Sequence, residues 1–243
     1  MGSFFAGIKA GTLSGMLYVG GLAIFNVALL YALKGDVLRA IQSSYSSVCA
    51  PTAIGNGTVS IEDCFSSVVS VDVPYVAFVA FFISLLYAGI FGRVYDSLPG
   101  TSPVFRGELI ATIVGANLLF FGFAGFYFDF ESEVATSVFL LIWSIVFGFF
   151  LGRLYKKYTR VVQFSADHPD LLKVMVDGSN QTGKSRTFAL TSSHRVRADV
   201  AEDASFREWK PSGGISVEDP RSFETLFEVN GDGVLKGQAS KKY

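Results

Sequence analysis

Four long apolar runs without charged side chains fill the first two thirds of the chain. They cover residues 11–33, 73–92, 109–128 and 134–152. Each is close to the roughly 20 residues that a helix needs to cross about 30 Å of hydrocarbon. The pattern predicts a four-helix transmembrane domain over residues 1–160. The first run is longer than the apolar part of a secretory signal peptide, so we interpret it as a span, with a cleaved signal as the alternative.

The pattern changes after Gly152 to short runs in which apolar and polar residues alternate. Gly, Asn, Asp and Pro separate these runs, which is typical of strands joined by turns. We therefore expect an antiparallel, all-β sandwich or barrel over residues 161–238, followed by a tail, 239–243. Residues 230–233 predict a tight hairpin turn. The expected strands are 161–165, 171–176, 186–190, 195–200, 205–209, 214–217, 223–229 and 234–236.

Composition agrees with a membrane protein and narrows the chemistry. Half of the residues are hydrophobic and 17% are charged. The apolar runs contain no Asp, Glu, Lys, Arg or His, which disfavours pumps and proton-coupled transporters. Both histidines, His168 and His194, follow the last run, which excludes haem held by paired histidines inside the membrane. No spaced set of metal ligands occurs either, so we expect no cofactor, no metal site, no catalytic residue and no nucleic-acid partner.

The basic residues near the ends of the runs predict the orientation of the chain. With the N-terminus inside, seven of them are cytoplasmic and two are outside, which places the C-terminal domain in the cytoplasm. The seven are Lys9, Arg93, Arg106, Arg153, Lys156, Lys157 and Arg160, against Lys34 and Arg39.

The expected external loop, residues 34–72, contains both cysteines of the chain. Cys49 and Cys64 lie among Ser, Gly, Pro and Asn residues, and a glycosylation sequon begins between them at Asn56. A disulfide in an oxidising compartment would restrict this loop by about 3 kcal/mol on the chain-entropy model. We expect this disulfide, with two unpaired surface thiols as the alternative.

The second and fourth runs end in the same way. Residues 91–95 and 151–155 both read apolar-Gly-Arg-apolar-Tyr. This similarity suggests two tandem helical hairpins of equal orientation. The alternative is that both ends carry ordinary snorkelling and aromatic-belt anchors.

Small and polar residues within the runs predict how the helices pack. Glycines allow helices to approach closely, within one chain or between chains. The candidates for such packing are Gly11, Gly15, Gly89, Gly92, Gly115 and Gly148. Asn26 and Asn117 are the notable polar residues, and we interpret them as interhelical hydrogen-bonding groups, with a polar pathway as the alternative.

Residues 178–185 match the GxxxxGKS pattern of a phosphate-binding loop. Such a loop needs a helix directly after it, because the helix N-terminus binds the phosphates. Residues 186–193 instead have the period of a strand. We interpret the match as a chance feature of a polar hairpin loop and expect no nucleotide site.

Parts of the C-terminal domain resemble known prokaryotic β-modules. Residues 172–178, followed by 187–190 and 193–196, look like PEGA domains, in which a strand ending in Val-Asp-Gly turns into a second strand. Residues 204–209, 213–220, 223–225 and 231–233 are similar to internalin-type B-repeats. The resemblance implies a binding module without catalytic residues, with Phe206 and Trp209 in its core. Such modules mostly work outside the cell, so an extracellular domain is the alternative to the cytoplasmic one.

Two classes of function follow from these features. The first is a non-enzymatic membrane scaffold or accessory subunit that lies in the lipid bilayer and self-associates or binds a protein partner through its β-module. The second is an oligomeric channel or facilitator for a small neutral solute, since an uncharged interior suits neutral solutes better than ions. An intramembrane enzyme would need a nucleophile and base or a metal cluster, which the sequence lacks.

Overall fold

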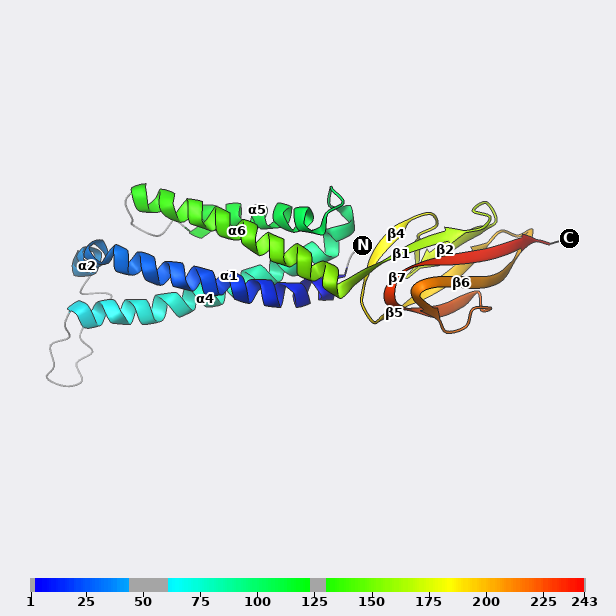
Figure 1. Ribbon diagram of the computed structural model, residues 1–243, viewed down its shortest axis with the longest axis horizontal. Helices are drawn as coiled ribbons and strands as arrows, with labels where there is room; N and C mark the ends of the chain where they lie inside the picture. The colour runs from blue at the N-terminus through cyan, green and yellow to red at the C-terminus, as the bar shows by residue number, and fades with distance from the viewer. Residues whose placement is uncertain (1–2, 44–60, 123–129, 243) are drawn as a thin grey trace. The chain divides into compact units, whose positions relative to one another are not determined.

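The computed structural model describes residues 3–43, 61–122 and 130–242. A helical region precedes a β domain along the chain (Figure 1). The helices are α1 (Phe4–Ala32), α2 (Lys34–Ser43), α4 (Ile61–Val94), the 3-10 helix η1 (Tyr95–Ser97), α5 (Pro103–Gly122) and α6 (Phe130–Tyr158).

Three stretches of helix in the described part of the chain are long and apolar enough to cross a bilayer. They are Phe4–Ala32, Asp63–Ser97 and Val138–Tyr158. Their outward side chains are largely apolar, including Phe5, Ile24 and Phe78. The expected combination of apolar helices and a C-terminal β domain is therefore confirmed. The predicted run 109–128 begins in α5 and ends in residues outside the description.

The helices are longer than the apolar runs that predicted them. Helix α1 begins at Phe4, seven residues before Gly11. The exposed Lys9 limits the uncharged run in the sequence but is compatible with a helix. Helix α4 begins at Ile61 and continues through Pro74. The segment 34–72 was expected to be one external loop, but it contains α2 and the first turns of α4 in its described residues. Charged residues of this segment limit the apolar run that begins at residue 73, but α4 continues through them.

Aromatic side chains join α1 to α6. Trp143 Nε1 donates a hydrogen bond to the Tyr18 carbonyl oxygen at 2.8 Å. The rings of Phe25 and Phe139 stack with centroids 3.7 Å apart. Burying large aromatic surfaces in this way stabilises helix contacts where the backbone is already satisfied.

The β domain is one mixed sheet whose strands alternate buried and exposed side chains. In β2, Leu172, Val174 and Val176 are buried while Lys173 between them is exposed. This alternation places one face of the strand toward a core. The strands are β1 (Thr159–Ala166), β2 (Leu172–Val176), β3 (Ser179–Asn180), β4 (Ser185–Ala189), β5 (Ser192–Val200), β6 (Ala204–Val217) and β7 (Glu224–Lys241).

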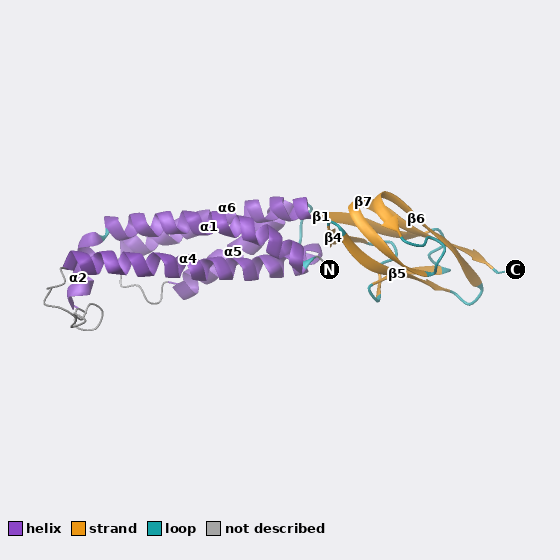
Figure 2. Cartoon of the chain, turned by 90° about the horizontal axis from the view of Figure 1, so that it is seen from below, coloured by secondary structure: helices purple, strands orange, loops and turns teal. Residues whose placement is uncertain are grey.

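The order of strands in the sheet is β3-β2-β5-β7-β1-β4, and β6 pairs with β7. All ladders are antiparallel except β1 with β7, which is parallel from Val162↔Gly233 to Ala166↔Gly237. The expectation of a purely antiparallel arrangement is wrong at this ladder. Helices and strands occupy separate parts of the chain, as the colouring in Figure 2 makes clear.

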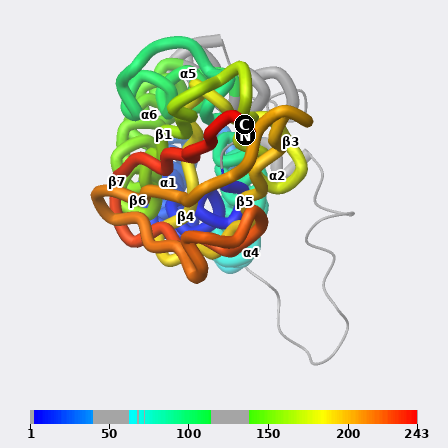
Figure 3. Tube along the Cα trace, turned by 90° about the vertical axis from the view of Figure 1, so that its right-hand side faces the viewer, coloured from blue at the N-terminus to red at the C-terminus, as the bar shows by residue number. Residues whose placement is uncertain are grey.

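The predicted hairpin at 230–233 is wrong, because β7 runs through these residues as one strand. Strand β6 follows it along the whole ladder, and the two curve together (Figure 3). Gly213, with φ of +68°, pairs with Gly233, and the register shifts beside it. A side chain at Gly213 or Gly233 would overlap the partner strand. The glycines therefore bend two paired strands at one level instead of ending them.

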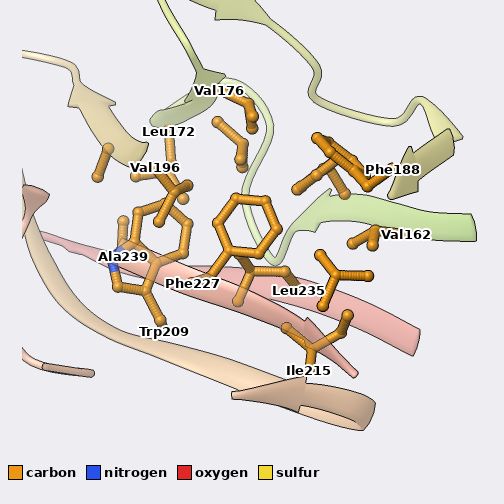
Figure 4. Packing of buried hydrophobic residues seen from close by; sticks show 14 residues of the cluster. Val162, Leu172, Val176, Phe188, Val196, Trp209, Ile215, Phe227, Leu235 and Ala239 are labelled. Carbon is orange, nitrogen blue, oxygen red and sulfur yellow. The ribbon is translucent and has the colours of Figure 1, made fainter. Parts of the chain in front are cut away.

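The inward faces of the strands form a continuous hydrophobic core. Trp209 is 1% exposed, and its indole Nε1 donates to the Ser222 carbonyl oxygen at 3.0 Å. Phe164, Phe188 and Phe227 pack edge to face with centroids 5.7–5.9 Å apart. Figure 4 shows Trp209, Phe227 and Leu235 directed into the same interior.

Candidate functional site: the helix–sheet junction

The ends of three helices meet at Tyr155 of α6. Its side chain is fully buried; the Ser3 backbone N–H donates to Tyr155 Oη at 3.0 Å, and Oη donates to the Gly92 carbonyl oxygen at 3.1 Å. The rings of Phe91 and Tyr95 lie 5.1 and 4.5 Å from the Tyr155 ring. One phenol therefore ties the start of α1 to the end of α4.

Both helical hairpins use the same close approach at this level. Gly92 of α4 lies against Gly7 of α1 and against Ser3, which directly precedes α1, and Gly152 of α6 lies against Pro103 of α5. A Cβ at either glycine would overlap backbone atoms of the facing helix. These are the glycines of the two matching sequence segments, so the matching residues occupy matching positions.

The matching tyrosines have different surroundings. Tyr155 receives the Ser3 N–H, but Pro103, which faces Gly152 as Ser3 faces Gly92, has no N–H to donate. Tyr95 instead packs against the Arg106 guanidinium, which lies 4.6 Å from its ring centroid. A cation over an aromatic face is a favourable contact of about 0.5–2 kcal/mol.

Asp96 of η1 joins this helical end to the β domain. The Thr187 backbone N–H donates to Asp96 Oδ2 at 3.2 Å, and Thr187 Oγ1 donates to Asp96 Oδ1 at 2.5 Å. Thr187 lies on β4, the last strand in the sheet order, which has one free edge. The carboxylate satisfies a backbone donor on that edge, where unpaired groups would attract another strand.

Helix α6 passes into β1 with no linker. The helix ends at Tyr158 and the strand begins at Thr159. The Leu190 N–H donates to the Tyr158 carbonyl oxygen at 2.9 Å, and Thr159 Oγ1 donates to the Tyr155 carbonyl oxygen at 2.8 Å. Arg160 folds back onto the last carbonyls of α6, which are the groups that a helix leaves unpaired. The last turn of α6 and the sheet are therefore one hydrogen-bonded unit.

Replacing Asp96 by alanine should loosen this junction. Hydrogen bonds to a charged group contribute about 1.5–3 kcal/mol, and Thr187 would lose two. We expect faster hydrogen exchange of the Thr187 amide, measured by mass spectrometry on the full chain. Asp199→Ala, at an exposed position of β5, is the control. Unchanged exchange in the Asp96 variant would show that the carboxylate does not hold the strand.

A second polar cluster lies at one end of the β core. His194 Nδ1 is 3.0 Å from Asp177 Oδ2, and His194 Nε2 is 2.9 Å from Ser192 Oγ. This order of groups is that of a nucleophile, a base and an orienting carboxylate. However, Ser192 Oγ donates to the Ala189 carbonyl oxygen at 2.6 Å, so its proton is directed into the β4–β5 turn. The cluster fits turn stabilisation better than nucleophilic chemistry.

The segment 178–185 contains two turns. Asp177 and Gly178 both have positive φ, as a two-residue type I′ hairpin between β2 and β3 requires. The Lys184 N–H donates to the Gln181 carbonyl oxygen at 2.9 Å, closing the second turn. Strand β4 follows directly, in the place where a phosphate-binding loop has its helix.

The solvent face of β2, β5 and β7 carries a hollow of about 610 Å³. It is lined by two arginines and two carboxylates together with Met175 and Gly178. Arg195 forms an ion pair with Glu224 at 3.2 Å. Charged groups of both signs on a concave surface suit a polar partner. The charged lining residues are Asp177, Arg195, Arg197 and Glu224.

The glycines that were expected to pack helices together lie at several levels of the bundle. Gly11 is buried on α1, and Gly15 faces Ser84 of α4. Gly89 lies against Phe4, and Gly148 lies against Ala111 of α5. Gly115 belongs to α5, but its surroundings are outside the description.

The remaining predicted residues are distributed over both parts of the chain. Asn26 is half-buried on α1, and Asn117 lies on α5 at a position whose surroundings are not described. Cys64 is 2% exposed in a cluster at the start of α4, whereas Cys49 and Asn56 lie outside the described residues. Phe206 is partly buried against Trp209 in the β core.

The sequence analysis noted the segments that contain Tyr95 and Tyr155 but gave these tyrosines no role at the junction, and it did not single out Asp96 or Thr187. Tyr95 and Tyr155 are 7% and 0% exposed, which is not where an aromatic belt at a membrane surface places tyrosines. Their repeated Gly-Arg-x-Tyr context was a usable signal. Asp96 and Thr187 gave no local signal in the sequence, because they are far apart along the chain.

Comparison of the chain with protein-family models gives no match. Searches of curated proteins and of solved structures likewise return no match.

Proposed function

We propose that the protein is a non-enzymatic membrane scaffold or accessory subunit. Four transmembrane helices, arranged as two tandem hairpins, anchor it in the bilayer. The β domain presents a binding surface for a protein partner or a second copy of the chain. Its resemblance to PEGA-like and internalin-like modules is in keeping with this role.

The observation that carries the proposal is the way the β domain is fixed to the helix ends. Strand β1 continues α6 without a linker, and Asp96 bonds Thr187 of β4. A module on a flexible tether needs neither feature. A fixed one suits a scaffold, because a binding surface that is already oriented loses less entropy when its partner docks.

The orientation that we propose puts the N-terminus and the β domain in the cytoplasm, following the excess of basic residues at that end. The segment between α2 and α4 is then outside, where an oxidising compartment would allow Cys49 and Cys64 to form a disulfide. The hollow on β2, β5 and β7 is the surface that we assign to the partner.

Purification of the full chain from its native membrane in mild detergent tests the proposal. We expect a defined oligomer or a stoichiometric partner, measured by light scattering and quantitative mass spectrometry. Arg197→Glu reverses a charge in the hollow and should release the partner or disrupt the oligomer. Lys241→Glu, at an exposed position of β7 that does not line the hollow, should not. A monodisperse monomer without partners would refute a scaffold role.

A further inference from the structure

Exposed basic side chains surround the helix ends at the junction. We call them the basic collar. The Ser3–Tyr155 hydrogen bond and the contact between Gly7 and Gly92 bring the three helices that carry the collar together. The collar consists of Lys9 on α1, Arg93 on α4, and Arg153, Lys156 and Lys157 on α6.

The five side chains of the collar have no ion-pair partner among the residues that the structure describes. The Asp96 carboxylate accepts two hydrogen bonds from Thr187. Five exposed positive charges on neighbouring helix ends create a field that attracts anions.

Large apolar side chains are exposed beside the collar on the same helices. Phe5 is 76% exposed, and Phe4 and Ile90 are also exposed. Basic residues next to exposed aromatic and aliphatic ones, on helices long enough to span a bilayer, are typical of the boundary between headgroups and acyl chains. A nucleic acid or an acidic peptide would match the charges but not the apolar neighbours.

We propose that the basic collar binds the phosphate groups of anionic phospholipids in the surrounding leaflet. The inference rests on the proposed membrane location and adds the class of lipid. Lys and Arg side chains reach headgroups while their aliphatic stems cover apolar surface. Each basic residue near a membrane surface strengthens binding to anionic lipid about fivefold.

The lipid that remains bound to the full chain is the measurement. The protein is reconstituted into vesicles of phosphatidylcholine and phosphatidylglycerol and extracted in mild neutral detergent, and the two retained lipids are quantified by mass spectrometry. The collar variant carries Lys156→Gln and Lys157→Gln. The matched control carries Lys173→Gln and Lys241→Gln, which remove the same charge from exposed positions of the β domain. Titration with inorganic phosphate distinguishes a membrane headgroup from a free anion.

We expect phosphatidylglycerol to be enriched over its share of the vesicle in the parent and the control, and this enrichment to fall several-fold in the collar variant. Inorganic phosphate should not bind detectably. Equal retention by all three proteins, or tight binding of free phosphate, would overturn the inference. If the chain failed to insert into any vesicle, the proposed membrane scaffold itself would fall. Insertion without a preference for phosphatidylglycerol would refute the collar alone.

Discussion

Replacing Gly92 by alanine should destabilise the helical hairpin even though alanine is the better helix former. The new Cβ would overlap the Ser3 carbonyl oxygen and approach the Gly7 backbone. These are backbone atoms, so α1 and α4 must move apart, and overpacking of this kind costs about 1–3 kcal/mol. The same movement would weaken the hydrogen bond from Tyr155 Oη to the Gly92 carbonyl. We expect a lower thermal midpoint of the detergent-purified chain, measured by loss of monodisperse protein after heating.

Gly20→Ala is the matched control. Gly20 also lies within an apolar helix, but it is exposed and has no atom within 4 Å of an added Cβ. Alanine there reduces the freedom of the unfolded chain and should be neutral or stabilising by up to about 1 kcal/mol. The two substitutions are chemically identical, so opposite signs isolate the close approach at Gly92. Equal effects at both positions would argue against that contact.

The Trp209→Ala variant should lose a large share of the stability of the β domain. The indole is buried in the core, packs on Phe206 with ring centroids 5.1 Å apart, and donates to the Ser222 carbonyl. Truncating a buried Trp costs about 3–5 kcal/mol, a large share of the roughly 5–15 kcal/mol that a domain has. Hydrogen exchange of the β7 amides around Phe227, measured on the full chain, should become much faster.

The Phe223→Ala variant provides the comparison for this loss. Phe223 is a large aromatic residue just before β7, but it is 58% exposed. Its removal should change stability by no more than about 0.5 kcal/mol, as for most surface positions. If both variants exchanged at the same rate, Trp209 would not be the central core residue that its burial indicates.

Hydrophobic runs predicted the helices but not their ends. A run without charges marks the part of a helix that suits hydrocarbon. The helix itself continues wherever backbone hydrogen bonds and spacing allow, as α4 does from Ile61 to Val73. The charged and polar side chains in those turns interrupt the pattern in the sequence without interrupting the structure.

Alternation predicted most strands, and glycines misled the prediction of their connections. Gly231 and Gly233 looked like a turn because glycine is favoured in turns. They are paired in space with Gly214 and Gly213 on β6, which no local rule detects. The parallel pairing of β1 with β7 is equally invisible locally, because the two strands are separated by most of the domain.

The junction was the least predictable part of the molecule. Its central contacts join residues from the start, the middle and the last third of the chain, such as Ser3 with Tyr155 and Asp96 with Thr187. The sequence, read locally, shows the glycines and tyrosines but not the residues that they contact. The repeated Gly-Arg-x-Tyr segments were the one local indication that these residues lie at the same part of the structure.

Because β1 follows α6 without a linker, the length of α6 also sets the rotation of β1 about the helix axis. Each residue of an α-helix turns the chain by about 100°, since 3.6 residues complete a turn. One residue inserted into the last turn of α6 would swing β1 through that angle about the helix axis and carry Thr187 away from Asp96. Insertions before Tyr158 should therefore be far less tolerated than insertions in the exposed turn between β5 and β6 at Glu202 and Asp203. The number of residues in α6 therefore determines the direction in which β1 leaves the helix.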